Sequence, residues 1–307
     1  MSDESASSAV KNPARLPSAS ILPRAAALIE VVAAFALVHV TYRFFKRFTE
    51  LGQAEVGTGL NFSPGAVMIL FTVAVVWLRG RSFADYGLTL KDGRFSLNFG
   101  LIWGMLFTLA AALVIKLASI HFDPLHPPDL KKALFATSGE LVNTCLLLWF
   151  LIRRRKVLFL TPLITLPILV FFLSIPLALA LSFDKPFLHT ALTVLWLFFG
   201  AGFGEEIFFR GFIQSRVNEA FGRPFRFLGV EFGWGLVVSA TLFGCIHVLN
   251  TVDYFGGRYD FAWLWWPPNF AAGLFFGLLR EKTRSILAGA IVHGLSDVSA
   301  TVPEMLG

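Results

Sequence analysis

Long apolar runs separated by short polar segments dominate the chain. A helix needs about 20 mainly apolar residues to cross a bilayer, and nine runs approach that length. The pattern predicts an all-α, polytopic bundle of transmembrane helices with nine spans. The predicted spans are Ala25–Tyr42, Ser63–Leu78, Leu97–Ile120, Ala133–Ile152, Phe159–Phe183, Leu188–Ser215, Gly229–Asn250, Ala262–Leu279 and Ser285–Val302.

The fourth run leaves a second count open. Ala133–Ile152 contains Glu140, Asn143 and several small polar residues, so it is the least apolar of the set. If this segment is re-entrant or lies in the interface, the bundle has eight spans.

The runs divide the chain into three parts. Residues 1–24 are rich in Ser, Ala and Pro and lack the apolar core and cleavage site of a secretory signal. We expect them to form a disordered cytoplasmic tail. Residues 25–186 then hold the first five helices, and residues 187–307 hold the sixth to the ninth.

Composition and charge support a membrane protein. Hydrophobic residues make up 56% of the chain and charged residues 15%, with a mean hydropathy of +0.69, outside the range of ordinary soluble domains. The net charge of +6 comes from Lys and Arg clusters between the apolar runs, not from one patch. This arrangement argues against a nucleic-acid partner. Placing the N-terminus in the cytoplasm puts most of these charges on the cytoplasmic face, and the short chain favours a prokaryotic cytoplasmic membrane.

The sixth run carries charges where they are costly. Glu205, Glu206 and Arg210 lie near the middle of an apolar segment, where each charge costs about 2.5–3.5 kcal/mol on insertion scales unless it is paired or hydrated. Glu206 and Arg210 are four residues apart, so they share a helical face and can form an ion pair. Glu205 points to a different side of the helix and is left for chemistry.

Two later runs add further polar side chains. His247 lies in the seventh run, and His293 and Asp297 share a helical face in the ninth. Histidines on two different spans, beside a helix that bears carboxylates, indicate one convergent polar site. Close helix approach is available from two pairs of small residues, Gly200 with Gly204 and Gly273 with Gly277.

These three motifs, in this order on successive helices, resemble those of the CPBP (Abi) family of intramembrane proteases, which includes the CAAX prenyl endopeptidases. They cover roughly Phe199 to Ala300, and Ser82–Leu90 resembles a short stretch that family members carry upstream. The resemblance implies an endopeptidase for a membrane-tethered protein or peptide. It implies that Glu205 and His247 activate water, that Glu206 and Arg210 support them, and that His293 and Asp297 stabilise the oxyanion or orient the substrate.

Asp297 departs from the family pattern, because prenyl endopeptidases typically have Asn at this position. An ionised aspartate cannot donate a hydrogen bond to an oxyanion. Asp297 must therefore be protonated, orient His293, or bind a metal. Two histidines with carboxylates match the ligands of a catalytic zinc site, so Glu205, His247, His293 and Asp297 are also candidate zinc ligands, although we favour metal-free chemistry.

A different class of function uses the same residues. A non-proteolytic membrane scaffold or a transporter could bury these charges to bind a partner or line a path. Transporters often show repeated halves with broken helices, whereas the candidate charges here gather in one third of the chain. Other polar residues are expected to be structural: Glu140, His39 and His189 as lone buried groups, and His121, Asp123, His126 and Asp129 as a solvated turn.

Overall fold

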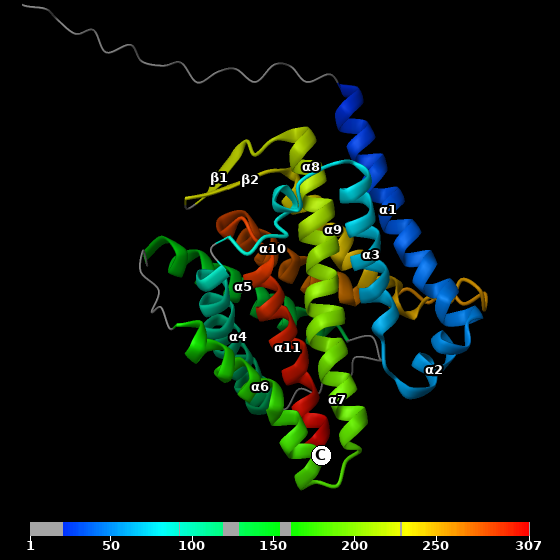
Figure 1. The fold of residues 1–307 in the computed structure, drawn as a ribbon, viewed down its shortest axis with the longest axis vertical. Helices are drawn as coiled ribbons and strands as arrows, with labels where there is room; N and C mark the ends of the chain where they lie inside the picture. Colours follow the sequence, from blue (N-terminus) through cyan, green and yellow to red (C-terminus); the bar gives the residue numbers. More distant parts are fainter. Residues whose placement is uncertain (1–20, 92, 119–128, 154–160, 228, 307) are drawn as a thin grey trace, which may run out of the picture.

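The computed structural model describes residues 21–91, 93–118, 129–153, 161–227 and 229–306, which include most of the predicted spans (Figure 1). The long elements are all helices, which confirms the all-α class. They are α1 (Ile21–Phe48), α2 (Glu50–Thr58), α3 (Phe62–Leu78), α4 (Gly93–Ala118), α5 (Leu130–Arg153), α6 (Pro162–Ser182), α7 (Phe187–Leu195), α8 (Gln214–Phe221), α9 (Trp234–Val248), α10 (Trp266–Thr283) and α11 (Leu287–Leu306). Tail residues 1–20 and the loop residues His121, Asp123 and His126 lie outside the described ranges.

Several helices are suited to a bilayer. Within the described ranges, four are long and apolar enough to cross a membrane: Leu22–Phe48, Pro162–Ser182, Phe187–Phe221 and Trp234–Thr251. Large apolar side chains such as Leu37, Leu163 and Leu188 are exposed on them, which suits contact with lipid rather than water. The protein is therefore a multi-pass membrane protein, while the count of nine spans stays a prediction.

The seventh predicted span differs from the structure at its start. Gly229 adopts a φ of +79° and turns the chain between two antiparallel strands, β1 (Phe225–Phe227) and β2 (Val230–Phe232). The helix begins only at Trp234. A count of apolar residues includes β2 in the span, because Val230 and Phe232 are as hydrophobic as the residues of a membrane-spanning helix.

The central element is a continuous helical rod from Phe187 to Phe221 (Figure 1). The sequence predicts a regular α-helix here, but the rod departs from that form. Two segments within it, η2 (Trp196–Phe203) and η3 (Glu206–Ile213), are π-helical. π-Helical turns are rare in proteins, and those that occur often lie at functional sites. Both carboxylates of the sixth span, Glu205 and Glu206, lie at the junction of η2 and η3.

Glycines let neighbouring helices pack backbone to backbone against the rod. A Cβ on Gly65 of α3 would lie 2.3 Å from the carbonyl oxygen of Gly200, and one on Gly204 would lie 2.8 Å from the Cα of Gly65. On another side, a Cβ on Gly202 would lie 2.6 Å from the Cα of Gly294 in α11. The predicted pair Gly200 and Gly204 does provide close approach, and Gly202 adds a second crossing beside the candidate site.

The segment between α3 and α4 is docked onto the C-terminal third. Gly87 has a φ of +73°, and its carbonyl accepts a hydrogen bond of 3.1 Å from the backbone N–H of Ile286. The Tyr86 ring stacks on Phe212 of η3 at a centroid distance of 6.4 Å. This segment, which resembles the family's upstream stretch, therefore braces both the rod and the start of α11.

A buried carboxylate connects two helices at one end of the bundle. Glu281 of α10 accepts hydrogen bonds from Gln214 (2.8 Å), Asn218 (2.6 Å) and Arg223 (2.6 Å). These donors come from α8 and the start of the hairpin. The network holds α8 and α10 together at the same end of the molecule as the β-hairpin (Figure 1).

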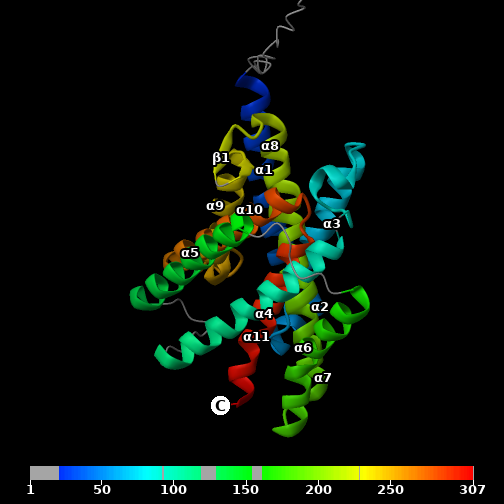
Figure 2. The same ribbon diagram turned by 90° about the vertical axis from the view of Figure 1, so that its left-hand side faces the viewer.

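Helices α4 and α5 pack on the outside of the C-terminal third of the chain. Helix α4 packs on α11, and α5 packs on α10. Figure 2 shows α4 and α5 projecting to one side of the molecule, away from α6 and α7. The start of α1 and the hairpin lie at one end, whereas the α6–α7 turn and the end of α11 lie at the other (Figure 1).

The glycine crossing beside the site gives a first prediction. Gly202→Val would place side-chain atoms against the backbone of Gly294, so we expect overpacking to cost at least about 1–3 kcal/mol. The measurement is the monodisperse yield in detergent together with the thermal midpoint. Gly139→Ala in α5 is the matched control, because an added Cβ there meets nothing within 4 Å. A Gly202→Val protein as stable as the control would contradict this packing.

Candidate active site

Glu206 and Arg210 form a buried ion pair inside the bundle. Nη1 of Arg210 donates to Oε1 of Glu206 at 2.7 Å, and the two side chains are 0% and 1% exposed. The guanidinium also lies over the rings of Phe243, at 4.2 Å from the centroid, and Phe276, at 5.1 Å. Cation–π attraction of this kind is strongest where water is excluded, so one carboxylate and two aromatic faces hold this charge.

The same carboxylate oxygen also holds His293. Oε1 of Glu206 lies 3.1 Å from Nδ1 of His293, and because a carboxylate only accepts hydrogen bonds, Nδ1–H is the donor. Phe276 stacks on the imidazole at 4.8 Å. Gly289 leaves room for the carboxylate, since a Cβ there would lie 3.2 Å from the other Glu206 oxygen. The His293 ring is therefore fixed in place and orientation.

The free nitrogen of His293 faces two further carboxylates. Nε2 lies 3.5 Å from Oδ2 of Asp297 and 3.8 Å from Oε2 of Glu205. Glu205 and Asp297 are 19% and 29% exposed, unlike the sealed Glu206. Three carboxylates thus surround one imidazole.

His247 reaches the site from the end of α9. Its Nδ1 donates to the Phe243 carbonyl at 2.8 Å, which leaves a lone pair on Nε2 to accept a hydrogen bond. The ring is close enough to His293 and Asp297 for electrostatic interaction with both. The resemblance implies that Glu205 and His247 act together on a water molecule; within the described ranges, the ion-pair contact of Glu205 is with His293.

Two groups outside the C-terminal third also lie near the site. Tyr42 of α1 interacts electrostatically with Glu205, and Glu140 of α5 does so with His293. The Tyr42 hydroxyl is hydrogen-bonded to Nδ1 of His39 at 2.7 Å, so His39 is not the lone group that the sequence suggests. No sequence signal reveals these neighbours, because they depend on which helices pack together.

The arrangement does not fit a zinc site. Among the described residues, no group of three or more His, Cys, Asp and Glu side chains is placed to hold a metal ion. We therefore derive no step through a metal.

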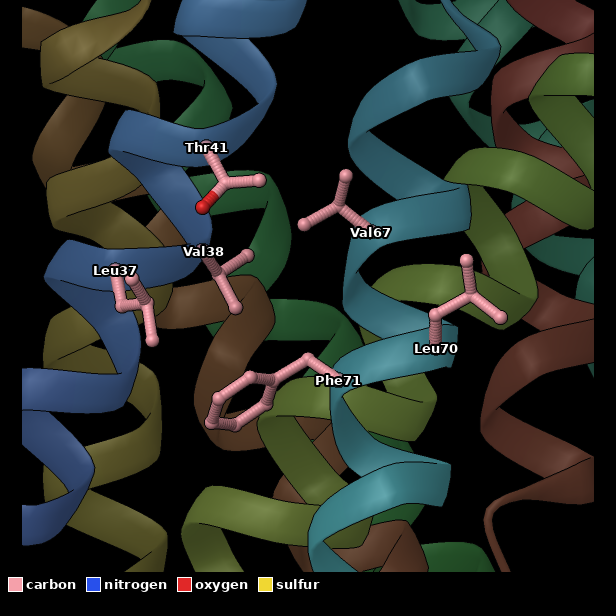
Figure 3. A pocket seen from close by; sticks show the side chains of 6 residues that line it. All are labelled: Leu37, Val38, Thr41, Val67, Leu70 and Phe71. Carbon is pink, nitrogen blue, oxygen red and sulfur yellow. The ribbon is translucent and has the colours of Figure 1, made fainter.

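A hollow between α1 and α3 lies apart from this chemistry. It has a volume of about 280 Å³, and side chains of the two helices face each other across it (Figure 3). Its lining residues are Leu37, Val38, Thr41, Val67, Leu70 and Phe71. Only Thr41 brings a polar side chain, and none of the candidate site residues lines it, so it is an apolar groove and not the active site.

Comparison with known proteins agrees with the motifs. Residues 187–299 match the family model described as type II CAAX prenyl endopeptidase Rce1-like. This segment belongs to the Rce1-like family of CAAX proteases. No curated protein and no solved structure matches the chain. The Rce1-like segment contains the whole candidate set, Glu205, Glu206, Arg210, His247, His293 and Asp297, and the resemblance to the CPBP family is confirmed. Membership of this family implies a membrane protease that acts on proteins.

The buried ion pair gives a second prediction. Arg210→Met keeps much of the side-chain volume but leaves the buried Glu206 charge without its arginine partner, and removing one partner of a buried pair costs about 3–5 kcal/mol. We expect a sharp loss of folded protein in detergent and a lower thermal midpoint. The double variant Glu206→Gln/Arg210→Met removes both charges and should recover much of the yield. Normal folding of Arg210→Met alone would show that the pair does not stabilise the bundle.

Proposed function

We propose that this protein is an intramembrane endopeptidase that hydrolyses a peptide bond in a membrane-tethered protein. The observation that carries the proposal is the approach of Glu205 and Asp297 to the Nε2 atom of His293, in a bundle where Arg210 and Nδ1 of His293 already engage Glu206. Ionisable groups inside a membrane bundle are costly and are kept mainly for function. Structural pairing explains Glu206 and Arg210, whereas the ion-pair contact of Glu205 within the described residues is with the site histidine, His293.

In this proposal Glu205 is the general base. The Glu205 side chain is 19% exposed, with its Oε2 atom buried, whereas the Glu206 side chain is 1% exposed, so of the two glutamates Glu205 is the one that water and substrate can reach. A water molecule lies between Glu205 and the Nε2 lone pair of His247. Glu205 takes its proton while the oxygen attacks the scissile carbonyl, and the proton then passes to the leaving amine.

His293 is proposed as the donor to the oxyanion. Glu206 already orients the ring through Nδ1, so Asp297 is not needed for that role. With a second proton on Nε2, His293 is an imidazolium that pairs with Asp297 at rest, and this fixed N–H donates to the negative oxygen that forms on the carbonyl during attack. Asp297 then serves as a resting acceptor, a role that Asn can also fill through its amide oxygen.

The topology proposed for the chain has nine spans with the N-terminus in the cytoplasm of a prokaryotic cell. The positions of the basic residues support it. Arg79 and Arg81 follow α3, Arg216 lies in α8 and Arg223 follows it. Ion pairs with Glu30 of α1 and Glu219 of α8 group the first three arginines, as the positive-inside rule requires of residues on the cytoplasmic side. A cavity among helices is reached most easily from the membrane plane, so the proposed substrate has a lipidated or apolar segment next to the cleaved bond.

The alternative function is a non-proteolytic scaffold or a transporter that uses the same buried groups. Such a protein needs the charges for binding or conduction but cleaves nothing. The two functions are separated by a test of turnover.

The third prediction concerns the base. Glu205→Gln keeps the shape of the side chain but removes its capacity to take a proton, so cleavage should fall by about 10²–10⁴-fold while folding is unchanged. The assay uses purified protein in liposomes with membrane-tethered reporter peptides, with and without a prenyl group. Glu231→Gln, at the exposed middle position of β2, is the matched control. Wild-type turnover by Glu205→Gln would favour the scaffold or transporter.

The fourth prediction concerns Asp297 and metal. Asp297→Asn should retain cleavage, and a strong chelator should leave both the wild type and this variant active, because Asn keeps an acceptor for His293. The measurement is the initial cleavage rate with chelator and after added zinc. Activity that is lost to chelator and recovered with zinc would instead establish a metal enzyme, with Asp297 among the ligands.

A further inference from the structure

A side chain from α1 contacts the turn in which α9 ends. Helix α9 ends at Val248, one residue after His247, and a 3₁₀ turn, Leu249–Thr251, follows it. The Leu249 carbonyl accepts the backbone N–H of Val252 at 3.1 Å, and a carbonyl oxygen has a second lone pair for another donor. Nη2 of Arg43 donates to the carbonyl oxygens of Leu249 at 2.9 Å and of Asn250 at 2.8 Å. A cationic donor at this end also interacts favourably with the negative pole of the helix dipole.

Further contacts hold the same two segments together. The rings of Phe44 and Phe48 meet Phe255 of the following loop at 6.0 Å and 5.1 Å. Tyr254 packs edge-on against His39 at 5.5 Å. Helix α1 therefore packs along the loop that follows α9. The Arg43 hydrogen bonds reach carbonyls two and three residues after His247 in the chain.

The position of His247 follows from this last turn. Its Nδ1 hydrogen bond runs to the Phe243 carbonyl one turn earlier, so the direction of Nε2 is set by the backbone between residues 243 and 250. A small shift of this backbone moves the Nε2 lone pair away from the attacking water. Misplacement of a catalytic group by about 1 Å can cost on the order of 100-fold in rate.

We propose that Arg43 is a positioning residue for His247. It acts through the Leu249 and Asn250 carbonyls and does not touch the substrate. This inference rests on the proposed function, in which His247 holds the water. It adds a part of α1 to the machinery of the site, outside the segment 187–299 that matches the protease family.

The fifth prediction tests the position of His247 directly. Full-length protein is labelled with ¹⁵N-histidine; the chain has six histidines, and spectra of His247→Asn and His293→Asn assign the two site rings. In Arg43→Met, which has no donor, the His247 ring signals should shift or broaden while those of His293 stay in place. The turnover number should fall about 10- to 100-fold with KM within about twofold. Arg43→Lys, which keeps a cationic donor, should recover part of the rate and of the His247 signal.

Arg47→Met is the matched control, because Arg47 is an exposed arginine one turn further along α1. It should change neither ring signal nor turnover. Unchanged His247 signals in Arg43→Met, or equal changes at His247 and His293, would overturn the inference. If Arg43→Met does not fold, Arg43→Gln, whose side chain is neutral and shorter, takes its place, and an unchanged His247 signal in that variant would overturn the inference as well. The ring signals do not require turnover, so a failed Glu205 test would reject the proposed function without deciding the role of Arg43.

Discussion

The negative charge of Glu206 inside an apolar bundle is the constraint on which the site depends. An unpaired carboxylate there would cost several kcal/mol. Hydrogen bonds from both Arg210 and His293 to one oxygen of Glu206 offset this unfavourable free energy. This shared acceptor joins the rod to α11, fixes the orientation of the His293 ring, and directs Nε2 at Glu205 and Asp297, whose side chains are partly exposed.

The surrounding fold serves this arrangement. Gly202 and Gly294 allow α11 to approach the rod closely enough for His293 to reach Glu206, and Gly289 leaves space for the carboxylate. Phe243 and Phe276 cover the guanidinium and exclude water. The neighbouring glutamates thus have separate tasks: Glu206 holds the structure, and Glu205 faces the accessible side of the imidazole.

Much of the fold and of the candidate site was predictable from the spacing of residues along the sequence. Apolar runs located the helices to within a few residues, and the four-residue interval between Glu206 and Arg210 predicted their ion pair. The π-helical turns and the β-hairpin were not predictable, because hydrophobicity does not distinguish these forms from a regular helix. The contacts of Glu206 with His293 and of Arg43 with Leu249 join residues 87 and 206 positions apart. Such contacts depend on helix packing, which a single sequence does not specify.

The central claim is that these buried charges cleave proteins in the membrane. The most direct measurement compares the new protein termini formed when a native membrane extract is incubated with liposomes that contain the wild type or Glu205→Gln. Mass spectrometry of the termini identifies each cleaved bond. The account predicts a set of new termini, next to apolar or lipidated segments, that only the wild type produces. Identical sets of termini from the two proteins would contradict it.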